Sequence, residues 1–147
     1  MGAKKIGDIK EICDIVNPDC AIITSVGEQH LDTFKSVDNV FKTKFELADA
    51  VSKKGGITLA KIDSTGINAR ADMRTDVVYF GKGTKYSAKN IVCDESGTTF
   101  DLSLDGSEFN VSTRLLGAHS VSDILAAATM PRRLLSLPNT DLNLNLM

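Results

Sequence analysis

A histidine follows a run of residues that is typical of a buried strand. The run Cys20–Val26 is short, nearly all apolar and rich in β-branched residues, and it ends at Gly27. Such runs form strands that are buried on both faces of a parallel sheet. Because ligands bind open α/β sheets at the carboxyl ends of the strands, His30 could reach one there. A neutral imidazole can ligate a divalent metal ion, although a histidine in this place is more often a capping or packing residue.

Two lysines follow on the next expected helix. Lys44 and Lys42 both lie within the segment 37–51, where apolar residues recur at helical spacing. On physical grounds both are expected to be solvated, with the aliphatic stem along the helix and the ammonium group in water. Spacing alone does not choose between these two lysines as a chemical group.

The elements that must position these side chains alternate between helix and strand. Proline ends a first helix at Pro18, and Ser36 caps the second, which stops at Lys53–Gly56. The order α-β-α-β-α-β predicts a doubly wound, mostly parallel sheet with right-handed crossovers. The expected segments are helix 6–16, strand 20–26, helix 37–51, strand 57–60, a weaker helix 64–73 and strand 76–80.

The second half of the chain has a different pattern. Three alternating segments, separated by Glu95–Gly97 and Asp105–Gly106, predict an antiparallel meander with hairpin turns. The glycine-rich Gly81–Lys85 lacks the spacing of a phosphate loop and is interpreted as a turn. The expected segments are strands 88–93, 98–104 and 108–114, a connector 115–120, a helix 121–135 interrupted by Pro131, and a frayed tail 136–147.

The composition narrows the class of protein. The chain has 147 residues, 42% of them hydrophobic, which is enough for one domain with a real core. A net charge of -2 without a basic stripe argues against a nucleic-acid partner. No apolar run approaches the length that spans a bilayer, and Met1–Lys5 does not lead into a signal-peptide core. We therefore expect a cytoplasmic protein with no membrane partner.

Two spaced motifs resemble the central domain of the Mur ligases. Ile23–Gly27 followed by His30-Leu31 is similar to the family's strand ending in Thr-Asn/Ser-hydrophobic-Gly and its x-x-His-Leu, and Lys44–Leu47 matches its Lys-x-Glu-hydrophobic helix at the family's spacing. Gly117–His119 also resembles part of its Gly-x-His-Asn-x-x-Asn signature. The resemblance covers residues 1–135 and leaves 136–147 as a tail. It is nearest to the members that add D-alanyl-D-alanine to UDP-MurNAc-tripeptide.

The resemblance implies a cofactor set and roles for individual residues. His30 would bind Mg²⁺, and Lys44 would be carbamylated so that its carbamate holds Mg²⁺ too, with Lys42 as the alternative. Glu46 would position the lysine. The reaction would be ATP-dependent amide formation through an acyl phosphate, with UDP-MurNAc-peptide and D-Ala-D-Ala as substrates. The residues expected to face the nucleotide are Asp63, His119 and Asp123.

The sequence also departs from the family pattern. It contains no Gly-x-x-Gly-Lys-Thr phosphate loop, and the acidic magnesium ligand would precede Met1. Ser120 and Asp123 replace two asparagines of the signature, and Lys61 replaces another. We therefore expect the chain to be inactive in isolation. The alternatives are a non-catalytic remnant and a domain completed by a partner, and an exposed sheet edge would favour self-association.

Overall fold

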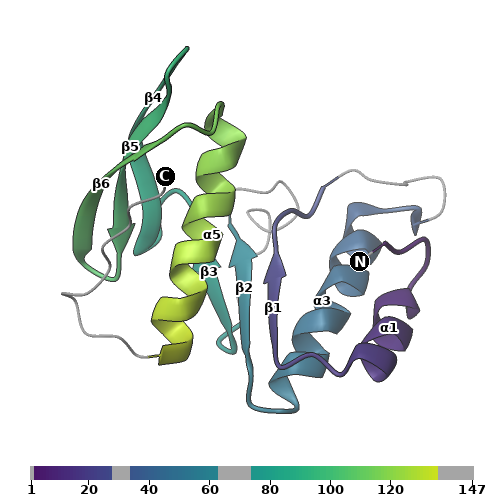
Figure 1. Ribbon diagram of the computed structural model, residues 1–147. Helices are drawn as coiled ribbons and strands as arrows, with labels where there is room; N and C mark the ends of the chain where they lie inside the picture. Colours follow the sequence, from purple (N-terminus) through teal and green to yellow (C-terminus); the bar gives the residue numbers. More distant parts are fainter. Residues whose placement is uncertain (1, 28–33, 63–73, 136–147) are drawn as a thin grey trace. The chain divides into compact units, whose positions relative to one another are not determined.

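The computed structural model describes residues 2–27, 34–62 and 74–135 (Figure 1). The chain divides into two compact units, Met1–Val78 and Tyr79–Met147, and each is described by itself. Four sequence expectations lie outside the described residues: His30, Asp63, the helix over 64–73 and the tail 136–147. Within the described ranges, no helix is both long enough and apolar enough to cross a membrane.

The first unit is built on a sheet with the strand order β1-β2-β3 (Figure 1). β1 and β2 run parallel, with Cys20 opposite Ile57 and Ile23 opposite Ala60. α3 packs against both of these strands, and α1 packs against α3. The elements are α1 (Asp8–Val16), β1 (Cys20–Ile23), α3 (Val37–Ser52), β2 (Ile57–Lys61) and β3 (Val77–Phe80), whose last two residues belong to the second unit.

Local chemistry explains where these helices begin and end. Asn17, with φ 50°, caps the C-terminus of α1 and donates its N–H to the carbonyl of Cys13. The Ser36 hydroxyl caps α3 by accepting the N–H of Asn39 at 3.2 Å, as the sequence predicts.

The core of this unit consists of side chains that are almost fully buried: Ile23, Val26, Val40, Phe45, Ala48, Val51, Leu59 and Ala60.

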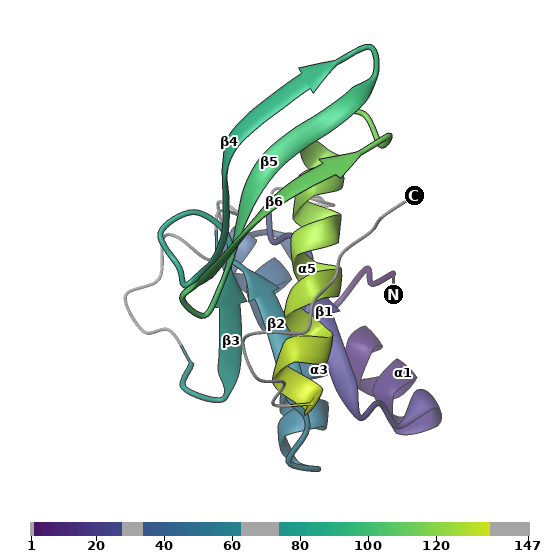
Figure 2. The ribbon, with the colours of Figure 1, turned by 60° about the vertical axis from the view of Figure 1, so that its left-hand side comes forward.

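The second unit is an antiparallel meander with a long helix (Figure 2). Phe100 pairs with Val111 and Leu102 with Phe109 across the second and third strands. The turn at Asp105–Gly106 has positive φ at both residues, as a tight hairpin requires. The elements are β4 (Tyr86–Asp94), β5 (Gly97–Leu104), β6 (Ser107–Thr113) and α5 (Ala118–Leu135), which packs against β4 and β5. The predicted α/β class with a parallel sheet, a meander and a C-terminal helix is confirmed.

Most element bounds differ from the sequence prediction by one or two residues, and the two largest differences are at β1 and α5. β1 ends at Ile23 rather than at Val26. α5 begins at Ala118 rather than at residue 121, because Gly117 at φ 90° turns the chain and its carbonyl accepts the Ser120 N–H. The interruption expected at Pro131 is wrong, since the helix continues through it. Proline removes one backbone hydrogen bond, but the burial of Met130 and Arg132 on either side holds the helix.

An arginine cluster ties α3 to the start of β3. Arg74 contacts Asp49 of α3 at 2.5 Å and Asp76 at 2.6 Å. The hydrogen bond from Arg74, helped by Ser52, holds the pKa of Asp76 well below its usual value of 3.8. The ionised carboxylate is therefore the form that stabilises the folded state.

We expect this cluster to stabilise the protein at neutral pH and to stop doing so in acid. A depressed folded-state pKa contributes stability above the unfolded pKa, and this contribution is lost as the pH falls through the folded value. Asp76→Asn should lower the free energy of unfolding by about 1 kcal/mol at pH 7, and by progressively less below pH 3.8. Urea unfolding between pH 2 and 7 measures this, with exposed Asp14→Asn as the control. A pH-independent difference would contradict the assignment.

Candidate functional site

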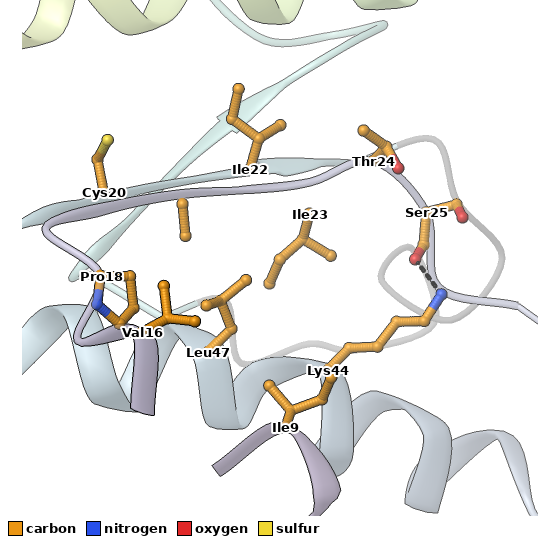
Figure 3. Close-up of a pocket in the computed structure, with 11 residues that line it drawn as sticks. Ile9, Val16, Pro18, Cys20, Ile22, Ile23, Thr24, Ser25, Lys44 and Leu47 are labelled. Carbon is orange, nitrogen blue, oxygen red and sulfur yellow. Dashed lines mark hydrogen bonds between the residues drawn. The ribbon is translucent and has the colours of Figure 1, made fainter. Parts of the chain in front are cut away.

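A groove of about 430 Å³ in the first unit runs between β1 and the helices α1 and α3 (Figure 3). Ile9, Val16 and Leu47 make its apolar wall. Thr24, Ser25 and Lys44 give it a polar end, where β1 has finished. The groove therefore presents one amine at the carboxyl edge of the sheet, which is the edge at which the sequence predicts a ligand.

The Lys44 amine is held at the end of this groove. Its Nζ donates to the carbonyl oxygen of Ser25 at 2.7 Å, and Figure 3 shows the side chain extending from α3 to that carbonyl. Partial burial lowers the pKa of Lys44, because loss of water disfavours the charged ammonium form. A larger fraction of this amine is therefore neutral and nucleophilic at a given pH.

Lys42 has a different environment on the same helix. Its Nζ pairs with Asp38 at 2.8 Å, one helical turn away, and its side chain is 61% exposed. An exposed pair at this spacing contributes only a few tenths of a kcal/mol. The structure thus separates two lysines that sequence spacing leaves equivalent.

Glu46 acts on α1. One carboxylate oxygen accepts the N–H of Gly7 at 2.7 Å, and the other accepts the N–H of Lys10 at 2.9 Å. Gly7 has no side chain to cap the helix, so a residue of α3 satisfies two amides that α1 leaves without helical partners. The carboxylate expected to position Lys44 therefore makes its hydrogen bonds to α1. Sequence reasoning missed this contact, for which the one signal was a glycine at an N-cap position.

Removing the Glu46 carboxylate should measurably destabilise the first unit. We expect Glu46→Ala to lower the free energy of unfolding by about 2 kcal/mol, because two helix amides lose a charged acceptor. Glu46→Gln should cost less, since the amide retains one acceptor oxygen. Chemical denaturation measures both variants. Glu108→Ala is the matched control, because its contact with Lys89 is long, at 3.9 Å, and exposed. Equal effects of Glu46→Ala and Glu108→Ala would contradict the capping role.

The other described candidates lie in the second unit. His119 and Asp123 are both exposed in the first turns of α5. A Cβ added to Gly117 would lie 2.7 Å from Cε1 of the imidazole, so this glycine leaves room for the ring.

The glycine-rich segment Gly81–Lys85 is a turn, as predicted: the Gly81 N–H donates to the Tyr86 carbonyl at 2.8 Å. Across the described part of the chain, no group of three or more His, Cys, Asp or Glu side chains could hold a metal ion.

Comparison with known proteins identifies the family to which this chain belongs. The family model of the Mur ligase middle domain matches residues 1–130, and the chain belongs to that family. A curated relative, the UDP-N-acetylmuramoyl-tripeptide–D-alanyl-D-alanine ligase of Haemophilus influenzae, is 27% identical over 131 residues, covering 88% of this chain and 28% of its own. The ligase of the same name from Buchnera aphidicola subsp. Acyrthosiphon pisum is 30% identical over 134 residues, covering 87% of this chain and 29% of its own.

A solved structure supports the same relationship. The MurF ligase from Thermotoga maritima in complex with ADP superposes with a TM-score of 0.77 at 25% identity, covering 91% of this chain and 32% of that chain. The chain thus spans less than a third of the length of these relatives.

Proposed function

We propose that this chain is the middle-domain part of an ATP-dependent ligase that joins D-Ala-D-Ala to UDP-MurNAc-tripeptide. The domain comprises residues 1–135, and 136–147 form a tail. The observation that carries the proposal is the placement of Lys44: in a chain of this family, an amine with a lowered pKa stands at the carboxyl end of β1. The proposed location is the cytoplasm, with no nucleic acid and no membrane as partner.

Lys44 is proposed to react with carbon dioxide. The ammonium first loses one proton to solvent. The neutral amine then attacks the carbon, a nitrogen–carbon bond forms while one carbon–oxygen π bond of carbon dioxide breaks onto oxygen, and a second proton leaves to solvent, so a cationic ammonium becomes an anionic carbamate. The carbamate nitrogen keeps one hydrogen, which fits the Ser25 carbonyl that accepts from Nζ at 2.7 Å. That hydrogen bond would direct the two carbamate oxygens away from β1. Hard cations prefer such anionic oxygen ligands.

His30 and the Lys44 carbamate would hold magnesium. When bound, the metal screens the anionic oxygens that must approach each other during phosphoryl transfer. The tripeptide carboxylate attacks the γ-phosphate of ATP, ADP leaves, and the amine of D-Ala-D-Ala then displaces phosphate from the acyl phosphate. Asp63, His119 and Asp123 are proposed to face the nucleotide. Glu46 holds α1 against the helix that carries Lys44.

The 147 residues alone are not expected to catalyse the ligase reaction, because they contain no Gly-x-x-Gly-Lys-Thr loop to bind the phosphates of ATP. A second candidate is therefore a non-catalytic or partner-completed domain. The observation behind it is that, within the described residues, β1 pairs with a neighbouring strand on one side only. Self-association through a sheet edge is part of this proposal.

A domain transplant tests the proposed function. The segment of the Haemophilus influenzae relative that aligns with this chain is replaced by residues 1–130 of this chain, and ADP release is measured. We expect release that requires both D-Ala-D-Ala and UDP-MurNAc-tripeptide. A chimera that folds cooperatively but releases no ADP with these substrates would reject the ligase proposal and favour the non-catalytic candidate.

A further inference from the structure

The connection between β1 and α3 is attached to α3 on both sides of residues 28–33, which lie outside the described ranges. Before them, the Nζ of Lys44 donates to the carbonyl oxygen of Ser25 at 2.7 Å (Figure 3). After them, the side-chain amide of Asn39 donates to the carbonyl oxygen of Phe34, also at 2.7 Å. Both attachments thus come from side chains of the same helix.

Buried side chains stand beside both attachments. Val26 follows Ser25 and is fully buried, and Phe34 is only 5% exposed. Burial of these apolar groups resists withdrawal of the chain from the first unit, because withdrawal would return their surface to water. Each hydrogen bond then fixes the direction of a backbone carbonyl beside a buried residue.

The backbone at Lys35 depends on the second attachment. Lys35 has φ 64°, a left-handed conformation that residues with long side chains rarely adopt. Such a residue persists where contacts fix the chain on both sides of it. Ser36 caps α3 on one side, and Asn39 holds the Phe34 carbonyl on the other. Asn39 therefore sets the direction in which the chain enters α3.

The spacing of the two attachments also keeps the ends of the connection near each other. Asn39 and Lys44 lie about 7.5 Å apart along the axis of α3, given the rise of an α-helix. An extended chain from Ser25 to Phe34 would span roughly 30 Å. Fixing the two ends close together removes conformational freedom from the residues between them, so holding one of their side chains in place costs less entropy.

We propose that Asn39 is a positioning residue of the proposed magnesium site. It fixes one end of the segment that carries His30, while Lys44 fixes the other end. The carbamate nitrogen of Lys44 keeps the hydrogen that the Ser25 carbonyl accepts, so the modification leaves that attachment in place. α3 would thereby support both proposed metal ligands. This role rests on the proposed function, in which His30 and the Lys44 carbamate hold the metal.

Hydrogen exchange of the whole chain tests the attachment. We expect Asn39→Ala to accelerate amide exchange in peptides covering 28–33 roughly tenfold or more, and to leave exchange in the second unit unchanged. Asn110→Ala is the matched control, because its side-chain amide donates to Asp101 at 3.0 Å in the meander. Equal exchange over 28–33 in the two variants would overturn the proposal. So would amides of 28–33 that already exchange, in the unmodified chain, at the rate of an unstructured peptide.

Asn39→Asp keeps the experiment decisive if Asn39→Ala unfolds. An ionised aspartate has nearly the same shape and is favourable in the first turn of a helix, but it cannot donate to the Phe34 carbonyl. The same acceleration over 28–33 is expected. Exchange that matches the unmodified chain would show that the amide donor does not hold the segment.

The magnesium dependence of the transplanted domain tests the link to the site. At a fixed ATP concentration, Asn39→Ala should raise the Mg²⁺ concentration at half-maximal ADP release roughly tenfold, since a less firmly held ligand binds the metal more weakly. A smaller folded fraction would lower the rate without moving this concentration, so an unchanged value would overturn the positioning role. A chimera with no turnover would count against the ligase proposal, and the exchange experiment would then decide whether Asn39 holds the segment.

Discussion

Replacing Lys44 by arginine should lower the turnover of the transplanted domain by roughly 100-fold or more. Arginine keeps the charge and much of the length, but its guanidinium group is always protonated and cannot form a carbamate. Losing an anionic ligand of a catalytic metal removes several kcal/mol of transition-state stabilisation, and each 1.4 kcal/mol is about tenfold in rate. Steady-state ADP release by the chimera measures the loss.

Lys42→Arg is the control for this experiment. Lys42 lies on the same helix, two residues away, and its exposed pair with Asp38 can be made equally well by arginine. Turnover should therefore remain within about twofold of the unmodified chimera. If Lys42→Arg were the damaging change and Lys44→Arg the neutral one, the assignment of the two lysines would be reversed.

Gly97→Ala should produce the largest loss of stability. Gly97 has φ 147°, a conformation that side-chain-bearing residues rarely adopt. A Cβ there would overlap the carbonyl oxygen of Thr113 in the neighbouring strand and lie 3.1 Å from Cα of Arg114. Strained φ and steric overlap each cost about 1–3 kcal/mol, so we expect a loss of roughly 3 kcal/mol or more. Thermal and urea unfolding measure it.

Gly106→Ala separates the cost of the strained φ from the cost of the steric overlap. Gly106 lies in the next turn of the same meander at φ 90°, but an added Cβ there meets no atom within 4 Å. Its variant should therefore show the conformational cost alone, about 1 kcal/mol. If Gly97→Ala cost no more than Gly106→Ala, the close approach of Gly97 to β6 would be absent in solution.

Regular elements of the chain follow from sequence because their causes are local. Pro18 ends one helix, the Ser36 hydroxyl begins another, and Asp105–Gly106 has the backbone preference of a hairpin turn. α5 shows where local rules fail. A proline favours a break at position 131, but burial of side chains on both sides of it outweighs one missing hydrogen bond.

The candidate site was only partly predictable, because its contacts join residues that are far apart in the sequence. Helical spacing puts Lys42 and Lys44 on one helix, but only the packing of α3 against β1 turns Lys44 towards the Ser25 carbonyl. The capping of α1 by Glu46 joins residues 36 to 39 positions apart, a distance at which periodicity carries no information. Long-range contacts of this kind require the tertiary structure.

Carbon-13 NMR of the chain in labelled bicarbonate tests the central claim, the modification of Lys44, most directly. The lowered pKa of Lys44 and the acceptor at Ser25 predict a carbamate resonance for the unmodified chain and for Lys42→Arg. The resonance should be absent in Lys44→Arg. No resonance at saturating bicarbonate and pH 8, or one that disappears with Lys42→Arg and survives Lys44→Arg, would contradict the account.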